Sequence, residues 1–278
     1  MINREQYLQK RAMEMARLVQ AQPPMRKLCA RCLRPMKICF CQQLTAFDTQ
    51  TEFRILMHPK EAKQEKVGTG RLTSICLKQS AIIVGSEFND HAEVNQLISD
   101  KSYYAMILYP GESSHNISQA PLKSELMSHK KLLIFIIDGT WACAKSMMRD
   151  SANLHFLPKI SFGPTQISRF TIKHQPAKYC LSTIESVYNL LAGLNQWGHE
   201  RLGQEHEQLL YALDNLVQFQ VACTENPPQG SYRRGTYKSP AERQESKKWQ
   251  QRKICFDLKN YIYQKRSKLQ TAVRCSLT

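Results

Sequence analysis

Short runs of apolar residues alternate with polar, helix-spaced segments from Thr51 onward. The runs Phe53–Met57, Ala81–Val84, Tyr104–Tyr109 and Leu132–Ile137 have the length and composition of buried strands. Strands that alternate with helices form parallel sheets with helices on their faces. The pattern therefore predicts an α/β fold, with a mostly parallel sheet flanked by helices.

Longer amphipathic segments predict three further helices, at 3–20, 182–197 and 204–222. Two segments are expected to interrupt helical structure: Pro23-Pro24 and the Pro- and Gly-containing segment 226–231. We expect four parts: an N-terminal helix (1–24), a small cysteine-rich module (25–45), the α/β domain (46–226) and a basic C-terminal tail (227–278).

The charge of the chain is concentrated at its two ends. The formal net charge is +16; residues 1–40 hold nine Lys and Arg against two Glu, and residues 230–278 hold thirteen against three acidic residues. A near-neutral body with basic ends is typical of a protein that holds a polyanion such as RNA. A solubilising surface or a solvated tail is the alternative interpretation.

The apolar runs are too short for a membrane protein. The longest uninterrupted run has six residues, Leu132 to Ile137, whereas a membrane-spanning helix needs about 20. The first six residues do not resemble a secretory signal. We therefore expect a cytoplasmic protein with reduced thiols and no membrane association, and the pattern indicates no obligate protein partner.

Four of the ten cysteines form a compact cluster, Cys29, Cys32, Cys39 and Cys41, with the spacing C-x2-C-x6-C-x-C. Four thiolates so close in sequence can complete a tetrahedral shell around zinc, and nearby basic residues favour the thiolate form. The cluster predicts a closed, structural metal site, although a C-x-C pair is less usual than in common zinc ribbons. The choice between zinc and iron stays open.

The segment 132–141, Leu-Leu-Ile-Phe-Ile-Ile-Asp-Gly-Thr-Trp, is the most informative part of the chain. Asp138 stands at the carboxyl end of a predicted strand, where open α/β sheets place their ligands. Gly139 allows a tight turn, and Thr140 and Trp141 start the next predicted helix. A carboxylate, a hydroxyl and an indole are thus directed at one crevice. A capping Asp or Thr with a core Trp is the structural alternative.

Loops after two other predicted strands add candidates. His58 and Glu61 follow the first strand, and the run Gly68-Thr69-Gly70-Arg71 comes shortly after. Its glycines suit a backbone approached by an anion, and Arg71 suits a phosphate or carboxylate. The run Tyr109-Pro110-Gly111 ends the third strand and suits backbone contacts to a small cofactor. A simple turn is the alternative at both places.

The helix expected from Ser182 begins with Ser182-Thr183-Ile184-Glu185, the pattern of a capping box. In such a box the Ser182 and Glu185 side chains bond each other's backbone amides. The start of this helix could also receive a ligand carboxylate, and both roles can coexist. Lys173 lies upstream, in a loop that could close over a site.

Together these motifs resemble the DTW-domain family, the tRNA-uridine aminocarboxypropyltransferases. The resemblance covers residues 26–225 in the family's order and rests on the following motifs: Asp138-x-Thr140-Trp141 after an apolar strand, the cysteine cluster, His58-Pro-x-Glu61, Thr69-Gly-Arg-Leu72, the strand-end Tyr-Pro and Ser182-Thr-x-Glu185. Two positions depart from the family pattern. Gly68 stands where Asn is usual, and Lys173 stands where Arg is common, which would weaken a bidentate contact.

The resemblance implies a SPOUT-like fold with a C-terminal trefoil knot, preceded by a small zinc-binding module. It also implies transfer of the 3-amino-3-carboxypropyl group of S-adenosylmethionine to N3 of a tRNA uridine, with acp3U and methylthioadenosine as products. The bacterial enzymes of this type act at uridine 47. The expected co-substrate is S-adenosylmethionine, the expected partner is tRNA, and the expected structural ion is Zn²⁺.

The family motifs, carried over to this sequence, imply three groups of residues. Asp138, Thr140 and Trp141 would be catalytic: Asp138 accepts the N3 proton or orients the base, Thr140 bonds the cofactor or the base, and Trp141 stacks on uracil or faces the sulfonium. The implied cofactor-binding residues are Tyr109, Pro110, Gly111, Asp138, Gly139, Ser182, Thr183 and Glu185. The implied RNA-binding residues are His58, Glu61, Thr69, Arg71 and Lys173.

Two other functions fit the same sequence features. A SPOUT-type RNA methyltransferase would share the fold and the cofactor but would transfer a methyl group and release S-adenosylhomocysteine. A non-catalytic, zinc-containing RNA-binding protein would bind RNA without turnover.

Overall fold

A computed structural model describes residues 4–21, 27–64, 68–111, 113–123, 125, 129–164, 166–173 and 180–225. The basic tail expected at 227–278 lies outside these residues. The chain divides into two compact units, residues 1–42 and 43–278. The first unit contains α1 (Arg4–Ala21), close to the helix expected at 3–20, and the 3-10 helix η1 (Met36–Ile38); a second 3-10 helix, η2, spans Cys41–Gln43.

The second unit is built on a six-stranded sheet with the order β2-β1-β5-β3-β6-β4, in which every pairing is parallel. The strands are β1 (Glu52–Met57), β2 (Ser80–Val84), β3 (Tyr103–Leu108), β4 (His115–Asn116), β5 (Lys131–Asp138) and β6 (Lys159–Ser161). The predicted α/β fold with a parallel sheet is confirmed, and the four predicted strands are β1, β2, β3 and β5. The pattern missed β4 and β6, which are too short to show a periodicity.

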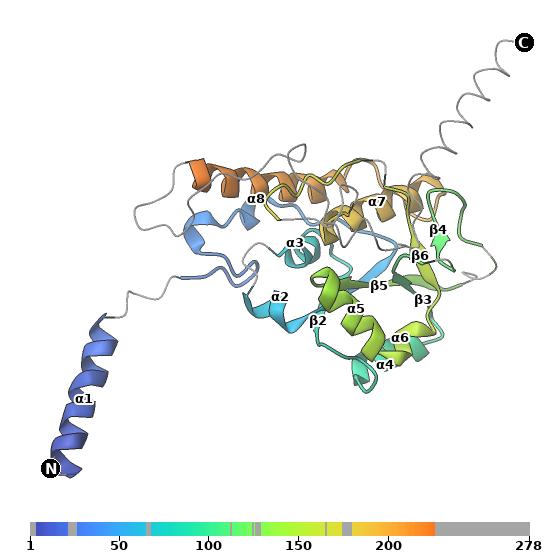
Figure 1. The fold of residues 1–278 in the computed structure, drawn as a ribbon. Helices are drawn as coiled ribbons and strands as arrows, with labels where there is room; N and C mark the ends of the chain where they lie inside the picture. Colours follow the sequence, from blue (N-terminus) through green and yellow to red (C-terminus); the bar gives the residue numbers. More distant parts are fainter. Residues whose placement is uncertain are drawn as a thin grey trace, which may run out of the picture. The chain divides into compact units, whose positions relative to one another are not determined.

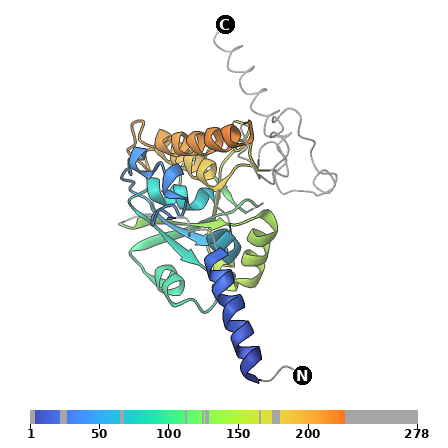
Figure 2. The ribbon, with the colours of Figure 1, turned by 90° about the vertical axis from the view of Figure 1, so that its left-hand side faces the viewer.

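Helices cover both faces of this sheet (Figures 1 and 2). They are α2 (Pro59–Gln64), α3 (Thr69–Cys76), α4 (Ala92–Ser99), α5 (Trp141–Asp150), α6 (Ala152–His155), α7 (Thr183–Gln196) and α8 (Glu207–Glu225). One layer contains α3, α7 and α8, which contact one another, and α4, α5 and α6 lie along the other face. The helices expected at 182–197 and 204–222 correspond to α7 and α8.

The central strand β5 packs against both helical layers. Leu133 and Phe135 belong to a buried cluster that includes Met147 of α5. Ile134 and Ile136 are also buried and project to the opposite face, where α7 contacts β5. Because side chains alternate along a strand, Asp138 projects to the same face as Ile134 and Ile136, toward the layer of α7.

The connections that follow β1 and β5 leave these neighbouring strands in opposite directions. The chain runs from β1 through α2 and α3 to β2, and from β5 through α5 and α6 to β6 on the other side of the sheet. Open α/β sheets bind ligands outside the carboxyl ends of their strands at such a topological switch point. In this chain the switch point lies where His58 follows β1 and Asp138 ends β5.

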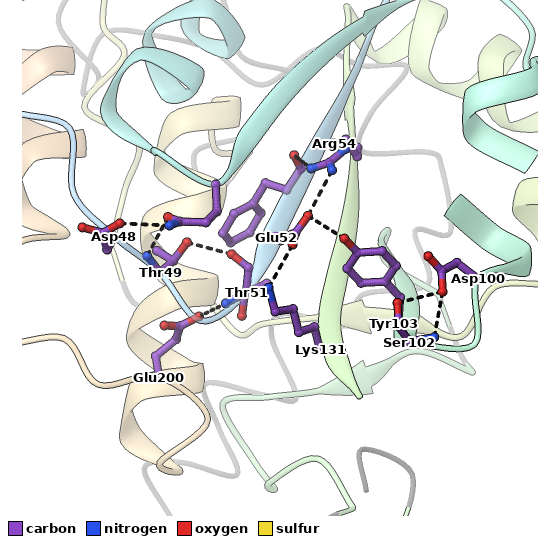
Figure 3. A network of polar contacts seen from close by, with 12 residues as sticks. Asp48, Thr49, Thr51, Glu52, Arg54, Asp100, Ser102, Tyr103, Lys131 and Glu200 are labelled. Atoms are coloured by element: carbon purple, nitrogen blue, oxygen red, sulfur yellow. Dashed lines mark hydrogen bonds and ion pairs between the residues drawn. The ribbon is translucent and has the colours of Figure 1, made fainter. Parts of the chain in front are cut away.

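The amino edge of the sheet is held by a polar network that contains none of the predicted site residues (Figure 3). Buried Glu200 accepts the backbone N–H groups of Gln50 at 2.8 Å and Thr51 at 2.7 Å. Glu52 Oε2 accepts hydrogen bonds from Arg54, at 3.0 Å, and from the Tyr103 hydroxyl, at 3.0 Å. Because these contacts fix the starts of β1 and β3, we assign the network a structural role.

Two further expectations concern membrane-spanning helices and the trefoil knot. Among the residues that the structure describes, no helix is long and apolar enough to cross a membrane. The SPOUT-like trefoil knot stays a prediction, because the connection from β6 to α7 includes residues 165 and 174–179, which lie outside the described residues.

Candidate functional site

Asp138 lies at the switch point with only 4% of its surface exposed. It pairs in register with Met57, the last residue of β1, and its carbonyl oxygen accepts the His58 N–H at 2.9 Å. On the side-chain side, Thr183 Oγ1 donates a hydrogen bond of 2.6 Å to Asp138 Oδ1. Because Thr183 is the first residue of α7, the carboxylate is held between two strand ends and the start of a helix.

Gly70, near the start of α3, has no Cβ atom and so leaves room for the Asp138 carboxylate. A Cβ atom at position 70 would lie 2.4 Å from Asp138 Oδ2 and 2.8 Å from Oδ1. Gly70 follows Thr69, the buried first residue of α3. The carboxylate therefore lies at the starts of both α3 and α7, where helix dipoles stabilise negative charge. The sequence suggested either a turn approached by an anionic ligand or a simple turn, and the carboxylate beside this turn is that of Asp138.

Thr140 and Trp141 begin α5 beside Asp138. Thr140 Oγ1 accepts the backbone N–H of Cys143 at 3.3 Å, so the capping interpretation of Thr140 is confirmed. Trp141 is 37% exposed, so the interpretation of Trp141 as a core residue is wrong. An indole at the edge of the switch point is accessible to a ligand.

Gly139 lies between His58, which follows β1, and Cys143 in the first turn of α5. Its φ is not in the left-handed region, so the expected tight turn does not depend on that conformation. A Cβ at position 139 would instead lie 3.4 Å from the Cβ of His58 and 3.2 Å from that of Cys143. Glycine at this position thus allows the start of α5 to lie close to the end of β1.

Two of the predicted RNA-binding residues pair with each other. Lys173 Nζ lies 3.6 Å from Oε1 of Glu61, a buried residue of α2. Arg71 donates a hydrogen bond of 3.2 Å to the carbonyl oxygen of Ala62, also in α2. These contacts join α2 to α3 and to the loop that precedes α7. Lys173, which the sequence places where the family commonly has Arg, therefore makes an ion pair within the chain.

The turn after β3 lies at the same edge of the sheet. Tyr109 donates its backbone N–H to Ile160 at 3.1 Å, and Pro110 and Gly111 follow. A Cβ on Gly111 would meet no atom within 4 Å, so the turn does not require glycine on steric grounds. Because β3 is the neighbour of β5, this turn borders the end of β5 that carries Asp138.

Glu185 is a buried carboxylate with four donors. Its Oε2 accepts the Ser182 N–H at 2.8 Å, the Ser182 hydroxyl at 2.6 Å and the Ser168 hydroxyl at 2.9 Å, and its Oε1 accepts the Arg169 N–H at 2.6 Å. The reciprocal bonds of a capping box are present, which confirms the predicted capping role. Glu185 therefore fastens the start of α7 to the loop around Ser168. No periodicity relates Ser168 or Arg169 to Glu185, so these two partners could not be predicted from spacing.

The four clustered cysteines lie together in the first unit. Their Sγ atoms are all within 4.8 Å of one another, with separations of 4.0 Å between Cys29 and Cys41 and 3.7 Å between Cys32 and Cys39. A tetrahedral zinc ion with Zn–S bonds of about 2.3 Å places its ligands about 3.8 Å apart. The geometry and the chemistry of this donor set fit a zinc ion held by four thiolates.

A short hairpin positions this cluster. The Cys29 N–H donates to Arg34 at 2.7 Å, and the Leu33 N–H donates to Cys29 at 2.8 Å, with Leu33 in the left-handed region at a φ of 57°. Hydrogen bonds from the backbone of Cys32 and Arg31 lower the pKa of Cys29 to about 6. Burial raises the pKa of Cys32. Since a metal ligand must be the thiolate, the lowered pKa of Cys29 favours metal binding by this residue.

A comparison with known protein families matches residues 26–221 to the DTW domain. The chain therefore belongs to the DTW-domain family. The matched region contains the cysteine cluster, the switch point and the starts of α3 and α7.

Curated relatives match about 70% of the chain. A protein of Macaca fascicularis named tRNA-uridine aminocarboxypropyltransferase 2 is 29% identical over 197 residues, which are 69% of this chain and 63% of the relative. A Drosophila melanogaster protein of the same name is 29% identical over 211 residues, 73% of this chain and 79% of the relative. The Arabidopsis thaliana protein tRNA-uridine aminocarboxypropyltransferase A is 26% identical over 218 residues, 70% of this chain and 81% of the relative. The chain thus spans less than two thirds of the macaque relative, and no solved structure matches it at a significant level.

Proposed function

We propose that this protein is a tRNA-uridine aminocarboxypropyltransferase that uses S-adenosylmethionine as the donor. The observation that carries the proposal is the buried Asp138 carboxylate, held at the switch point by Thr183 and approached by Gly70. The names of the relatives support a tRNA uridine as the acceptor. The products would be acp3U and methylthioadenosine, and uridine 47 is the expected position.

The proposed reaction joins N3 of the uridine to Cγ of the donor. Bound S-adenosylmethionine supplies a Cγ activated by the sulfonium, and the Cγ–S bond breaks with its electron pair on sulfur as the new C–N bond forms. The N3 proton must leave: Asp138 accepts it, or Asp138 holds the N3–H edge in line with Cγ and solvent water takes the proton. The Thr183 hydroxyl fixes the orientation of the carboxylate for either role.

The other side chains of the site orient the ligands or hold the helix starts in place. Trp141 is exposed beside Asp138 and stacks on the uracil or faces the sulfonium. The Thr140 hydroxyl caps α5 and so fixes the helix start that carries Trp141. Glu185 holds the start of α7, so its contribution to donor binding is made through Thr183 and the backbone there.

The remaining residues are proposed to contact the donor or the RNA because they lie near the carboxyl edge of the sheet. The proposed donor contacts are Tyr109, Pro110, Gly111, Gly139, Ser182 and Thr183, and the proposed RNA contacts are His58, Glu61, Thr69, Arg71 and Lys173. Cys29, Cys32, Cys39 and Cys41 would hold a zinc ion that stabilises the first unit and takes no part in the transfer.

Incubation of the purified protein with unmodified tRNA and S-adenosylmethionine tests the proposal. Methylthioadenosine together with acp3U in the digested tRNA supports it. S-adenosylhomocysteine would identify a methyltransferase instead, and RNA binding without turnover would identify a non-catalytic binding protein. Mass spectrometry of tRNA from cells with and without the protein locates the modified uridine.

A further inference from the structure

We propose that the exposed face of α5 docks the RNA strand that carries the target uridine, an inference that rests on the proposed function. This α5 face consists of Trp141, Lys145 and Arg149, which are all exposed. The helix begins three residues after Asp138 and leads away from the switch point. The α5 face therefore begins at the carboxyl edge of the sheet that also carries Asp138, and an RNA strand that follows this edge would reach both.

The spacing of the three residues forms a continuous stripe. Residues four apart in an α-helix lie on one side, about 6 Å apart along the axis. Met147 and Met148, on another side of the same helix, are buried and hold it to the sheet. Side chains on a helix tend to lean toward its start, and α5 starts at the carboxyl edge of the sheet.

The chemistry of the stripe suits a nucleic-acid strand. Aromatic planes that stack on bases, together with cations that contact phosphates, are the usual elements of single-stranded RNA binding. Lys145 is exposed. Arg149 donates to both carboxylate oxygens of Asp150, at 2.8 and 2.9 Å, and to the Ser146 hydroxyl at 2.9 Å. Because the Arg149 and Asp150 side chains are 72% and 41% exposed, a phosphate would compete for the guanidinium with a solvated partner.

A solvated helix surface is the simplest alternative. Lys and Arg near a helix end also interact favourably with the helix dipole, so their presence alone does not require a partner. The dipole does not account for an exposed indole in the first turn. Phe156, which is 88% exposed directly after α6, adds a second aromatic ring to the surface of the β5–β6 connection. An exposed indole four residues before an exposed cation on the same helix favours RNA over solvent alone.

Binding of an in vitro transcribed elongator tRNA, measured without S-adenosylmethionine over a range of KCl concentrations, tests this proposal. We expect Lys145→Glu to weaken binding roughly tenfold at low salt and to reduce the salt slope by about one, because a phosphate contact is lost. Lys145→Arg keeps the cation and should retain both values. Lys101→Glu is the matched control, since it makes the same charge change on an exposed residue that precedes β3, at the amino edge of the sheet.

Equal effects of Lys145→Glu and Lys101→Glu would overturn the proposal, because net charge alone would then explain them. An unchanged RNA affinity and an unchanged salt slope in Lys145→Glu would also overturn the proposal. Since the donor is absent from this assay, the result does not depend on turnover. RNA docking on the α5 face without acp3U formation would contradict the proposed function alone, and acp3U formation with unchanged RNA affinity in Lys145→Glu would contradict the docking surface alone.

Discussion

Thr183 Oγ1 and Asp138 Oδ1 lie 2.6 Å apart, although the two residues are separated by 45 positions in the chain. Their hydrogen bond joins the start of α7 to the end of β5. Two motifs that are independent in the sequence thus become one site through the topology of the sheet. In the proposed reaction, Thr183 determines how the Asp138 carboxylate is presented to the uridine.

Replacement of Thr183 tests this dependence. Thr183→Val removes the hydroxyl donor and keeps the shape, so we expect kcat for acp3U formation to fall about tenfold or more. Thr183→Ser retains the donor and should restore kcat. A Val variant with an unchanged kcat would show that Asp138 acts without Thr183.

Gly70→Ala tests the close approach of Asp138 to α3. The new Cβ would lie 2.4 Å from Oδ2, so the carboxylate must move. We expect transfer activity to drop and the free energy of unfolding to decrease by about 1–3 kcal/mol. Gly111→Ala, where a Cβ meets nothing within 4 Å, is the control for stability.

A double-mutant cycle makes the Gly70 test specific. Asp138→Ala removes the group that a Cβ at position 70 would strike, so Gly70→Ala should cost much less stability in that background. Strictly additive losses would mean that Gly70→Ala acts through some other contact.

The cysteine cluster predicts one bound metal ion for each chain. Elemental analysis of the purified protein should find about one zinc, and Cys39→Ser with Cys41→Ser should abolish it and lower the stability of the first unit. Cys223→Ser changes an exposed cysteine of α8 and should leave the metal content intact. Metal retained in full by the double variant would rule out the cluster as the site, and a visible absorption band from iron would correct the choice of ion.

The stability of the second unit should depend on pH through His199. Burial and the nearby His115 lower the pKa of His199, with Glu200 opposing this shift. The unprotonated Nε2 accepts the Leu122 N–H at 3.0 Å. As the pH falls, His199 therefore takes up a proton more readily in the unfolded chain than in the folded chain. The free energy of unfolding that neutral His199 contributes at higher pH is lost as the pH falls below the ordinary histidine pKa of 6.5.

Thermal unfolding between about pH 5.5 and 7.5 measures this contribution, since the range spans the ordinary histidine pKa. His199→Gln keeps an acceptor for Leu122 but cannot titrate, so its Tm should vary less with pH than that of the original protein. Parallel Tm curves for the two proteins would assign the pH dependence to other groups.

The sequence predicted those parts of the fold that show a continuous pattern. Six consecutive apolar residues locate β5, and they place Asp138 at its end because a strand buried on both faces must be apolar throughout. The strands β4 and β6 have only two and three residues, and their pairing is decided by the sheet around them. Their existence therefore could not be read from local periodicity.

The same distinction holds for the candidate site. Capping by Glu185 and by Thr140 is encoded within three residues; the spacing predicted the first, and the second was the structural alternative for Thr140. The pairing of Lys173 with Glu61, and of Ser168 with Glu185, depends on the path of a loop across the fold. No rule of spacing connects such residues, so only the structure shows that they are partners.

Product analysis of the Asp138→Asn variant tests the central claim most directly. The original protein and the variant are incubated with unmodified tRNA and S-adenosylmethionine, while donor binding is measured separately by calorimetry. We predict that the original protein forms acp3U and methylthioadenosine in equal amounts, and that Asp138→Asn binds the donor with similar affinity but forms neither product. Formation of acp3U by Asp138→Asn at the original rate would contradict the role of Asp138 on which the proposed function rests.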